Sequence, residues 1–170
     1  MNRAGILQAL ERDRRLLLLA LEGLDDKTLI SQEVVGDWTT KDLLGHVAMW
    51  QEVAVQFIAD YRRQGVPSSL GLDSDAALDA YNRRGVEERR AWPLERVRER
   101  LDASYADLEA AVESLNDEQL HAPLAQPWSG DETTLEQLIA NNSFDHNPEH
   151  VAQIRRVRDA ALRRDDSKTP

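Results

Sequence analysis

Two histidines near the end of the sequence have a spacing that can hold a metal ion. His146 and His150 are four residues apart, so on a helix their imidazoles lie one above the other on the same face. The same face carries Asn142 and Gln153, and its two ends are apolar. A buried polar group without a partner costs about 1–3 kcal/mol, so a polar column within a core stripe indicates a site. The pair also arises by chance on solvated faces, and a metal site therefore needs a third ligand.

A third histidine falls on the apolar face of an earlier predicted helix. Thr39 and Asp42 have the spacing of a capping box, which predicts that a helix begins there. The inward stripe of this helix includes His46 and Trp50. Taken by itself, His46 is explained by a core histidine with a nearby hydrogen-bond partner, and beside the later pair it becomes a candidate ligand. The fourth histidine, His121, lies in a proline-rich connection and is expected to face solvent.

Composition limits both the ligands and the partners. The chain has 170 residues, enough for one domain with a real core. Its 21 Lys and Arg against 31 Asp and Glu give a net charge of −10, which argues against a nucleic-acid partner. The sequence has no cysteine, so His, Asp or Glu must hold any metal. The longest apolar run, residues 16–21, is too short for a signal peptide or a membrane span, so we expect a soluble cytoplasmic protein without membrane partners.

The spacing of apolar residues predicts an all-α protein. Long amphipathic stretches cover residues 3–22, 39–61, 93–114 and a last segment through the histidine pair. Turn-forming residues over 65–71 are followed by a helix-like stretch over 73–90, which Gly85 weakens. This pattern, without alternating strands, indicates an antiparallel four-helix bundle with a long crossover between the second and third helices. We expect the bundle to cover residues 1–164 and a disordered tail to cover 165–170.

The two halves of the sequence resemble each other. Residues 24–29 and 115–120 are similar turn-like connections, each after a long helix. The tryptophan and capping box that follow in the first half are loosely matched by Trp128 and by the spacing of Thr133 and Glu136. Such an internal repeat predicts two related helix pairs. In each half of the sequence, the helix that follows the tryptophan and the capping box carries histidine.

A proline lies between the two neighbouring candidate ligands. Inside a helix, Pro148 would lose a backbone hydrogen bond and clash with the carbonyl group of Phe144, at about 3 kcal/mol or more. If Asn147 instead caps a new helix that begins at Pro148, His146 falls outside it and the four-residue geometry fails. We expect a kinked but continuous helix that keeps both imidazoles on one side, because kinks at functional sites are tolerated when neighbouring helices hold them.

Together the two histidine motifs resemble a known family. The sets are Trp38-Thr39-x-x-Asp42-x-x-x-His46-x-x-x-Trp50 and His146-x-x-x-His150-x-x-Gln153-Ile154. They are similar to the DinB-like superfamily, also named the YfiT-like metalloenzymes, over nearly the whole chain. The resemblance implies a four-helix bundle, a homodimer, and a divalent metal held by His46, His146 and His150. The superfamily includes transferases and isomerases that use low-molecular-weight thiols, and a hydrolase branch resembling the colibactin self-resistance protein ClbS; residues 81–105 do not show which branch applies.

Three neutral imidazoles leave coordination positions open, which is typical of catalytic sites. A metal there lowers the pKa of a water or a thiol, or polarises a carbonyl group. We therefore expect a hydrolase or a thiol S-transferase that acts on a small electrophilic substrate, with an external low-molecular-weight thiol as cosubstrate in the second case. Nitrogen ligands suit zinc, nickel or iron. Gln153, Asn142 and Trp50 are the candidate contacts to the ligands or the substrate.

Several questions stay open at the level of sequence. Asp42, Asp145 and Glu149 are near the histidines in sequence, but none can be assigned as a general base, and Asp42 could be fully used as a cap. The same bundle could also be a non-enzymatic protein that binds a small molecule or a metal, including a resistance protein. A purely structural bundle could carry the histidines without any metal.

Overall fold

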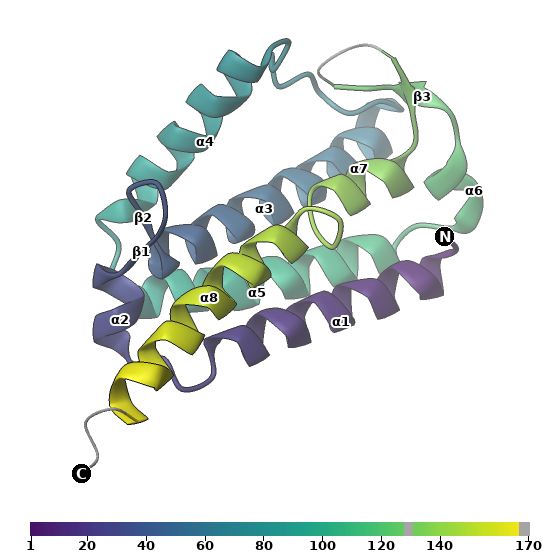
Figure 1. Cartoon of the computed structure of the whole chain (residues 1–170). Coiled ribbons are helices and arrows are strands. Elements are labelled where there is room, and N and C mark those ends of the chain that lie inside the picture. The colour runs from purple at the N-terminus through teal and green to yellow at the C-terminus, as the bar shows by residue number, and fades with distance from the viewer. Residues whose placement is uncertain (128–130, 167–170) are drawn as a thin grey trace.

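The computed structural model describes residues 1–127 and 131–166, which are mostly helical (Figure 1). The described helices are Arg3–Leu21 (α1), Asp26–Ser31 (α2), Thr40–Gln64 (α3), Asp75–Arg90 (α4), Leu94–Glu113 (α5), Asp117–His121 (α6), Leu135–Asn141 (α7) and Asn147–Asp166 (α8). The predicted all-α class is confirmed. Within these residues, no helix is apolar over a long enough stretch to cross a lipid bilayer.

Two small antiparallel ladders interrupt the helices. Glu33–Val35 (β1) pairs with Trp38–Thr39 (β2), and Leu124–Ala125 (β3) pairs with Glu132–Thr133 (β4). Sequence reasoning missed these strands because two or three residues are too few to produce an alternating pattern. Each ladder leads into a helix of the bundle. Strand β2 is followed immediately by α3, and one residue separates β4 from α7.

The predicted internal repeat is visible in the order of the elements. A long helix, a short helix, a two-stranded ladder and a further long helical segment occur first as α1 to α3 and again as α5 to α8. The connections predicted as turn-like contain the short helices α2 and α6, so that part of the prediction was wrong. The second capping box uses Thr134 and Gln137, one residue later than the predicted Thr133 and Glu136. Trp128, the predicted counterpart of the first tryptophan, lies outside the described residues.

The bundle consists of four helical segments, namely α1, α3, α5 and the consecutive pair α7 and α8 (Figure 1). One cluster of buried apolar side chains joins the start of α1 to the later parts of α3 and α5 and to α7. A second cluster joins the end of α1 to the early parts of α3 and α5 and to α8. Thus α3 and α5 run in the same direction, opposite to α1 and to α7 and α8. Helices α3 and α5 can be parallel because the predicted crossover between them contains α4, which returns along α3.

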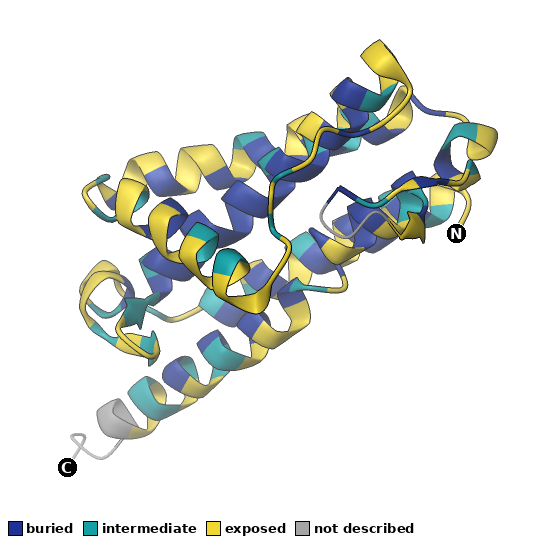
Figure 2. Ribbon diagram, turned by 90° about the horizontal axis from the view of Figure 1, so that it is seen from above, coloured by how far each residue is buried: buried dark blue, intermediate teal, exposed yellow. Residues whose placement is uncertain are grey.

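Burial follows the inward faces of these helical segments. Figure 2 shows buried residues on the faces that the helices turn toward one another and exposed residues on their outer faces. Polar residues are buried where the two apolar clusters meet, among them Asp13, His46, Gln51, Ser104 and Asn147. At its far end α8 continues to Asp166, past the predicted start of the tail, and residues 167–170 lie outside the described part of the chain.

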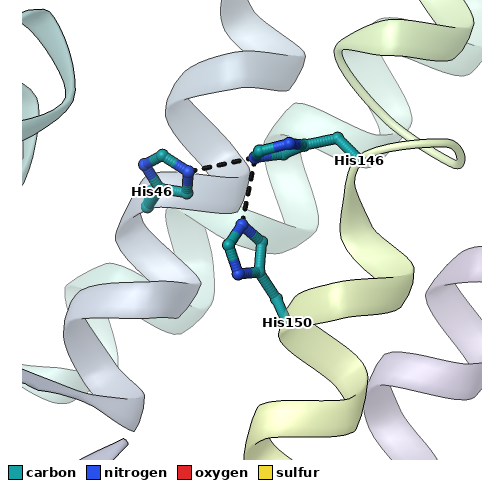
Figure 3. Close-up of side chains that lie close together, drawn as sticks. All are labelled: His46, His146 and His150. Atoms are coloured by element: carbon teal, nitrogen blue, oxygen red, sulfur yellow. Dashed lines mark hydrogen bonds between the residues drawn. The ribbon is translucent and has the colours of Figure 1, made fainter. Parts of the chain in front are cut away.

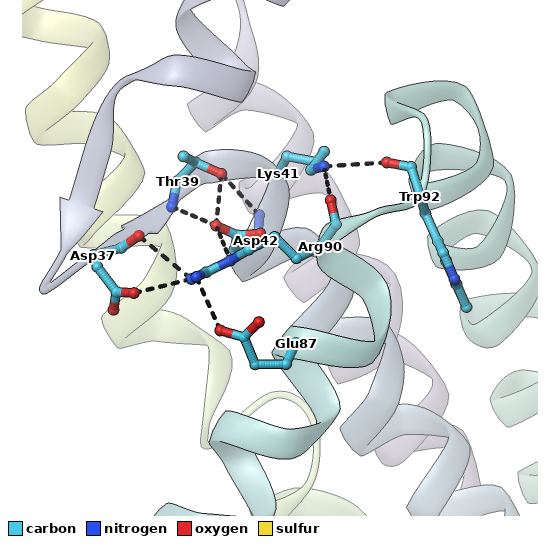
Figure 4. Close-up of polar contacts among 7 residues, drawn as sticks. All are labelled: Asp37, Thr39, Lys41, Asp42, Glu87, Arg90 and Trp92. Carbon is cyan, nitrogen blue, oxygen red and sulfur yellow. Dashed lines mark hydrogen bonds and ion pairs between the residues drawn. The ribbon is translucent and has the colours of Figure 1, made fainter.

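The start of α3 is fixed by its cap and by the end of α4. The hydroxyl group of Thr39 accepts a hydrogen bond from the backbone N–H of Asp42, and Asp42 Oδ2 accepts one from the backbone N–H of Thr39 at 2.9 Å, which confirms the predicted capping box. Lys41 Nζ donates to the carbonyl oxygens of Arg90 and Trp92, at 2.6 and 3.1 Å (Figure 4). A cation at the carbonyl end of α4 also interacts favourably with the helix dipole. These contacts set the position of α3 just before its histidine.

Gly85 in α4 allows a close approach to α3. Its position is buried, and a Cβ atom there would overlap the sulfur atom of Met49. The glycine that weakened the helix prediction therefore has a packing role, because only a residue without a side chain leaves room for Met49.

Replacing Gly85 by Ala should lower the free energy of unfolding by about 1–3 kcal/mol, because overpacking outweighs the better helix propensity of alanine. Urea unfolding measures the change. Gly45→Ala is a matched control at the same pair of helices, since a Cβ there would lie 3.4 Å from Arg89 Cδ, an ordinary contact distance. Equal stability of the two variants would contradict the steric explanation.

Candidate metal centre

Three histidine rings converge between α3 and the start of α8 (Figure 3). The Nε2 atom of His146 lies 3.1 Å from that of His46 and 3.0 Å from that of His150. Two nitrogens bound to one zinc ion at about 2.0–2.1 Å lie roughly 3.0–3.4 Å from each other. Two of the three nitrogen pairs therefore have the spacing of atoms that share one ion, and all three nitrogens lie within 4.8 Å of one another.

The environment keeps the rings of His46 and His146 neutral. Burial, followed by the nearby rings of His150 and His146, lowers the pKa of His46 to about 2. Burial and then His150 lower the pKa of His146 to about 4. At neutral pH these two imidazoles are therefore unprotonated and each has a nitrogen lone pair that can bind a cation.

The two C-terminal histidines are not on one continuous helix. Helix α7 ends at Asn141, and α8 begins at Asn147, so the predicted kinked but continuous helix was wrong. Pro148 instead occupies the first turn of a new helix, where its missing N–H has no intrahelical partner to lose. His146 lies in the turn between the helices, where its backbone N–H donates to the carbonyl oxygen of Ser143 at 3.0 Å. Its ring still faces that of the histidine on α8, so the predicted convergence is confirmed.

A buried carboxylate fixes the start of α8. Asp13 on α1 is 4% exposed, and its Oδ2 atom accepts hydrogen bonds from Asn147 Nδ2 at 2.6 Å and from the Tyr105 hydroxyl group at 2.7 Å. These bonds join α1, α5 and α8 in the bundle interior. Because Asn147 lies between His146 and His150 in sequence, anchoring it helps to fix the direction of both rings.

The sequence contained a signal for this carboxylate that was not used. Asp13 is three residues after Leu10 and four before Leu17, both of which are buried. That spacing places it on the apolar stripe of α1. A charged residue at such a position requires partners from other helices, which sequence alone does not identify.

Comparison with known proteins identifies the family. The sequence profile of the DinB superfamily matches residues 9–162. The chain belongs to the DinB superfamily. No curated protein matches the sequence.

Several solved structures share the fold of this DinB-superfamily chain. A protein from Streptococcus pneumoniae has 15% identity and a TM-score of 0.77, over 92% of this chain and 90% of that one. A protein from Escherichia coli UTI89 has 15% identity and a TM-score of 0.75, over 95% of both chains. The colibactin self-resistance protein ClbS, solved in complex with a double-stranded DNA, has 14% identity and a TM-score of 0.77, over 92% of this chain and 94% of that one. At these identities the likeness shows a common fold.

Other predicted site residues lie around the histidines of this superfamily member. Gln153 Oε1 is 3.0 Å from His150 Nδ1, and the ring of Trp50 lies 6.4 Å from that of His46. Sequence reasoning missed Trp38 as a site residue, although its ring lies 5.2 Å from the ring of His46. The rings of both tryptophans thus lie next to the ring of His46.

The carboxylates near the histidines in sequence do not supply an evident base. Asp42 is used as the cap of α3, as anticipated, while Asp145 and Glu149 are exposed. His121 is exposed at the end of α6, as predicted, although it lies in a helix and not in an irregular connection. His46 Nδ1 is buried and has no hydrogen-bond partner within the described residues.

A cavity of about 420 Å³ reaches the cluster from one side. Its walls include Trp50, Asn142 and His146, together with residues 72–75 at the start of α4. The predicted contacts Trp50 and Asn142 therefore line a space that is large enough for a small molecule and lies against a candidate ligand.

The stability contributed by Asp13 should depend on pH in a definite direction. Burial, the largest effect, raises its pKa above the ordinary value, although hydrogen bonds from Asn147 and Tyr105 and the charges of Arg12 and His150 act the other way. A raised pKa in the folded state gives stability that is present at low pH and is lost as the pH rises through that pKa. Asp13→Asn keeps an acceptor oxygen and cannot ionise. Its stability relative to the unmodified protein should therefore rise between about pH 4 and pH 7 in urea unfolding.

The exposed N-cap residue of α2 provides a control whose pKa is shifted in the opposite direction. A hydrogen bond with Thr28 lowers the pKa of Asp25 at the start of α2. Its stabilising contribution is present above the ordinary pKa of about 3.9 and is lost as the pH falls through the lowered value. Relative to the unmodified protein, Asp25→Asn should therefore change little in stability between about pH 5 and pH 7 and should gain stability below about pH 4. The same trend in both variants would contradict the assignment of a raised pKa to Asp13.

Proposed function

We propose that this protein is a metal-dependent enzyme in which His46, His146 and His150 hold one divalent transition metal ion. The observation that carries the proposal is the convergence of their Nε2 atoms, at 3.0 and 3.1 Å, with lowered pKa values for His46 and His146. Neutral nitrogens that face one another in a buried site repel each other's lone pairs unless a proton or a cation lies between them. Nitrogen ligands suit zinc, nickel or iron.

The surrounding residues prepare the nitrogens for this role. When Gln153 Oε1 accepts the N–H of His150 Nδ1, the Nε2 atom of that ring is the one left with a lone pair. The cap of α3 and the anchored Asn147 hold the two sides of the cluster at fixed positions. An ion bound there would act as a Lewis acid that lowers the pKa of a water or a thiol, or polarises a carbonyl group.

The reaction we propose is attack on a small electrophilic substrate. In a hydrolase the nucleophile is water, and in a thiol S-transferase it is an external low-molecular-weight thiol, because the chain has no cysteine of its own. The cavity beside His146 supports either class, since it gives a small molecule access to the histidines. Turnover of a panel of electrophiles with and without added thiols distinguishes the two.

A second candidate is a non-enzymatic resistance protein that binds a small molecule or a metal. It is favoured by the shared fold with the colibactin self-resistance protein, whose structure contains a double-stranded DNA. For the present chain, the net charge of −10 argues against a nucleic-acid partner. Tight binding of substrates without turnover would favour this candidate over the enzyme.

Replacing any one of the three histidines by Ala should weaken metal binding by roughly 10-fold or more, because even the loss of a residue that supports a ligand costs about 10–100-fold. Isothermal titration with zinc and with nickel measures the affinity. His121→Ala is the matched control and should leave it unchanged, since His121 is exposed on α6. Full metal occupancy in all three variants, or no binding by the unmodified protein, would remove the enzyme proposal in favour of a structural bundle.

We also propose that the protein is a homodimer. The proposal rests mainly on the resemblance to the superfamily, and the exposed apolar side chain of Leu18 on α1 adds support for a contact between two copies. Light scattering at micromolar concentration should give twice the mass of the chain, and a monomer would contradict the proposal.

A further inference from the structure

The cavity beside His146 has a distinctive distribution of charge. Asp73 and Asp75 line it, and no basic side chain does so within the described residues. Further along α4, a second cavity of about 380 Å³ is lined by Arg84 and Arg89 among acidic residues. The two acidic side chains are exposed at the rim of the first cavity, and neither Lys nor Arg lines it within the described residues.

A buried amide contributes an unused acceptor to the same cavity. Asn142 is 3% exposed, and its Nδ2 atom donates to the carbonyl oxygen of Leu138 at 2.6 Å. A carbonyl oxygen can only accept, so this bond fixes the amide with its Oδ1 atom on the other side. Unlike Nδ2, that oxygen makes no such bond within the described part of the chain, and it is not among the fully enclosed atoms there that lack a partner, so it is open to the cavity that Asn142 lines next to His146. An acceptor that opens into a cavity takes a donor from a ligand or from water.

The remaining walls are partly apolar and also include Ser74, Asn82 and Asn141. The indole ring of Trp50 and the side chains of Leu72 and Leu78 line the cavity. The indole N–H of Trp50 donates to Asn82 Oδ1 at 3.1 Å, so it is already used. The cavity thus combines an apolar surface with acidic and acceptor groups.

We propose that this cavity is the substrate subsite and takes a small molecule that carries an amine, or another cationic hydrogen-bond donor, on a short apolar body. The inference rests on the proposed function, because the molecule would present its reacting end to the histidines while its amine faces Asp73, Asp75 and Asn142. A carboxylate at the same place would meet two like charges and an acceptor oxygen.

The magnitude of the effect is set by screening. Two unit charges about 7 Å apart in water interact by a few tenths of a kcal/mol at about 0.1 M salt. Each of the two aspartates attracts a cationic probe and repels an anionic probe, so both effects add to the preference for the cation. We therefore expect the preference between a cationic and an anionic probe to change by about 5-fold when both aspartates are neutralised. Added salt should reduce this change.

Two thiols of similar length test the inference by binding alone. Cobalt-loaded protein is titrated with cysteamine and with 3-mercaptopropionate, and the absorption band of a thiolate bound to cobalt reports occupancy. The Asp73→Asn/Asp75→Asn variant should lower the affinity ratio of cysteamine to 3-mercaptopropionate about 5-fold relative to the unmodified protein at low salt. The intrinsic difference in acidity between the two thiols cancels in this comparison.

A matched control removes two charges from α4 at positions outside the cavity. Asp79→Asn/Glu88→Gln neutralises two exposed side chains of α4 that do not line this cavity, and it should leave the ratio unchanged. An unchanged ratio in the cavity variant, or an equal fall in the control, would overturn the inference. So would a protein that binds cobalt but gives no thiolate band with either probe. Failure to bind cobalt at all would overturn the proposed function itself.

Discussion

The arrangement of the site depends on one buried carboxylate. Asp13 is removed from water on α1, and it is tolerated there because Tyr105 and Asn147 donate to it from two other helices. Removing one partner of such a group leaves a buried charge without compensation, which makes the three positions interdependent. The carboxylate thereby sets the point at which α8 starts, and the start of α8 sets where two of the three imidazoles point.

The polar layer around this carboxylate lowers the stability of the fold. It separates two apolar clusters that would otherwise form one continuous core, and it includes buried atoms without partners within the described residues, such as Gln51 Nε2 and Asn147 Oδ1. Buried polar groups of this kind are worth less to stability than apolar packing. Their concentration beside three histidines is what a functional site produces, since such sites retain groups that packing alone would not select.

Features that depend on local chemistry could be predicted from the sequence, and features that depend on distant partners could not. Helical periodicity and the Thr39 cap gave the all-α class and the inward direction of His46. The break before α8 could not be derived from Pro148, because the residue that holds it, Asp13, is 134 positions away from Asn147. The short strands lacked a periodic signal, and Gly85 could be explained only once Met49 was seen against it.

The histidine cluster also has a topological consequence. His46 and His146 are 100 residues apart and belong to different halves of the repeated chain. A shared ion would therefore act as a crosslink that closes a long loop, and the chain entropy removed from the unfolded state by such a closure grows with loop length. Because a ligand that binds only the folded chain also shifts the folding equilibrium, occupancy of the site and resistance to proteolysis become coupled. Starvation for metal would then reduce the amount of protein that survives in the cell, as well as its activity.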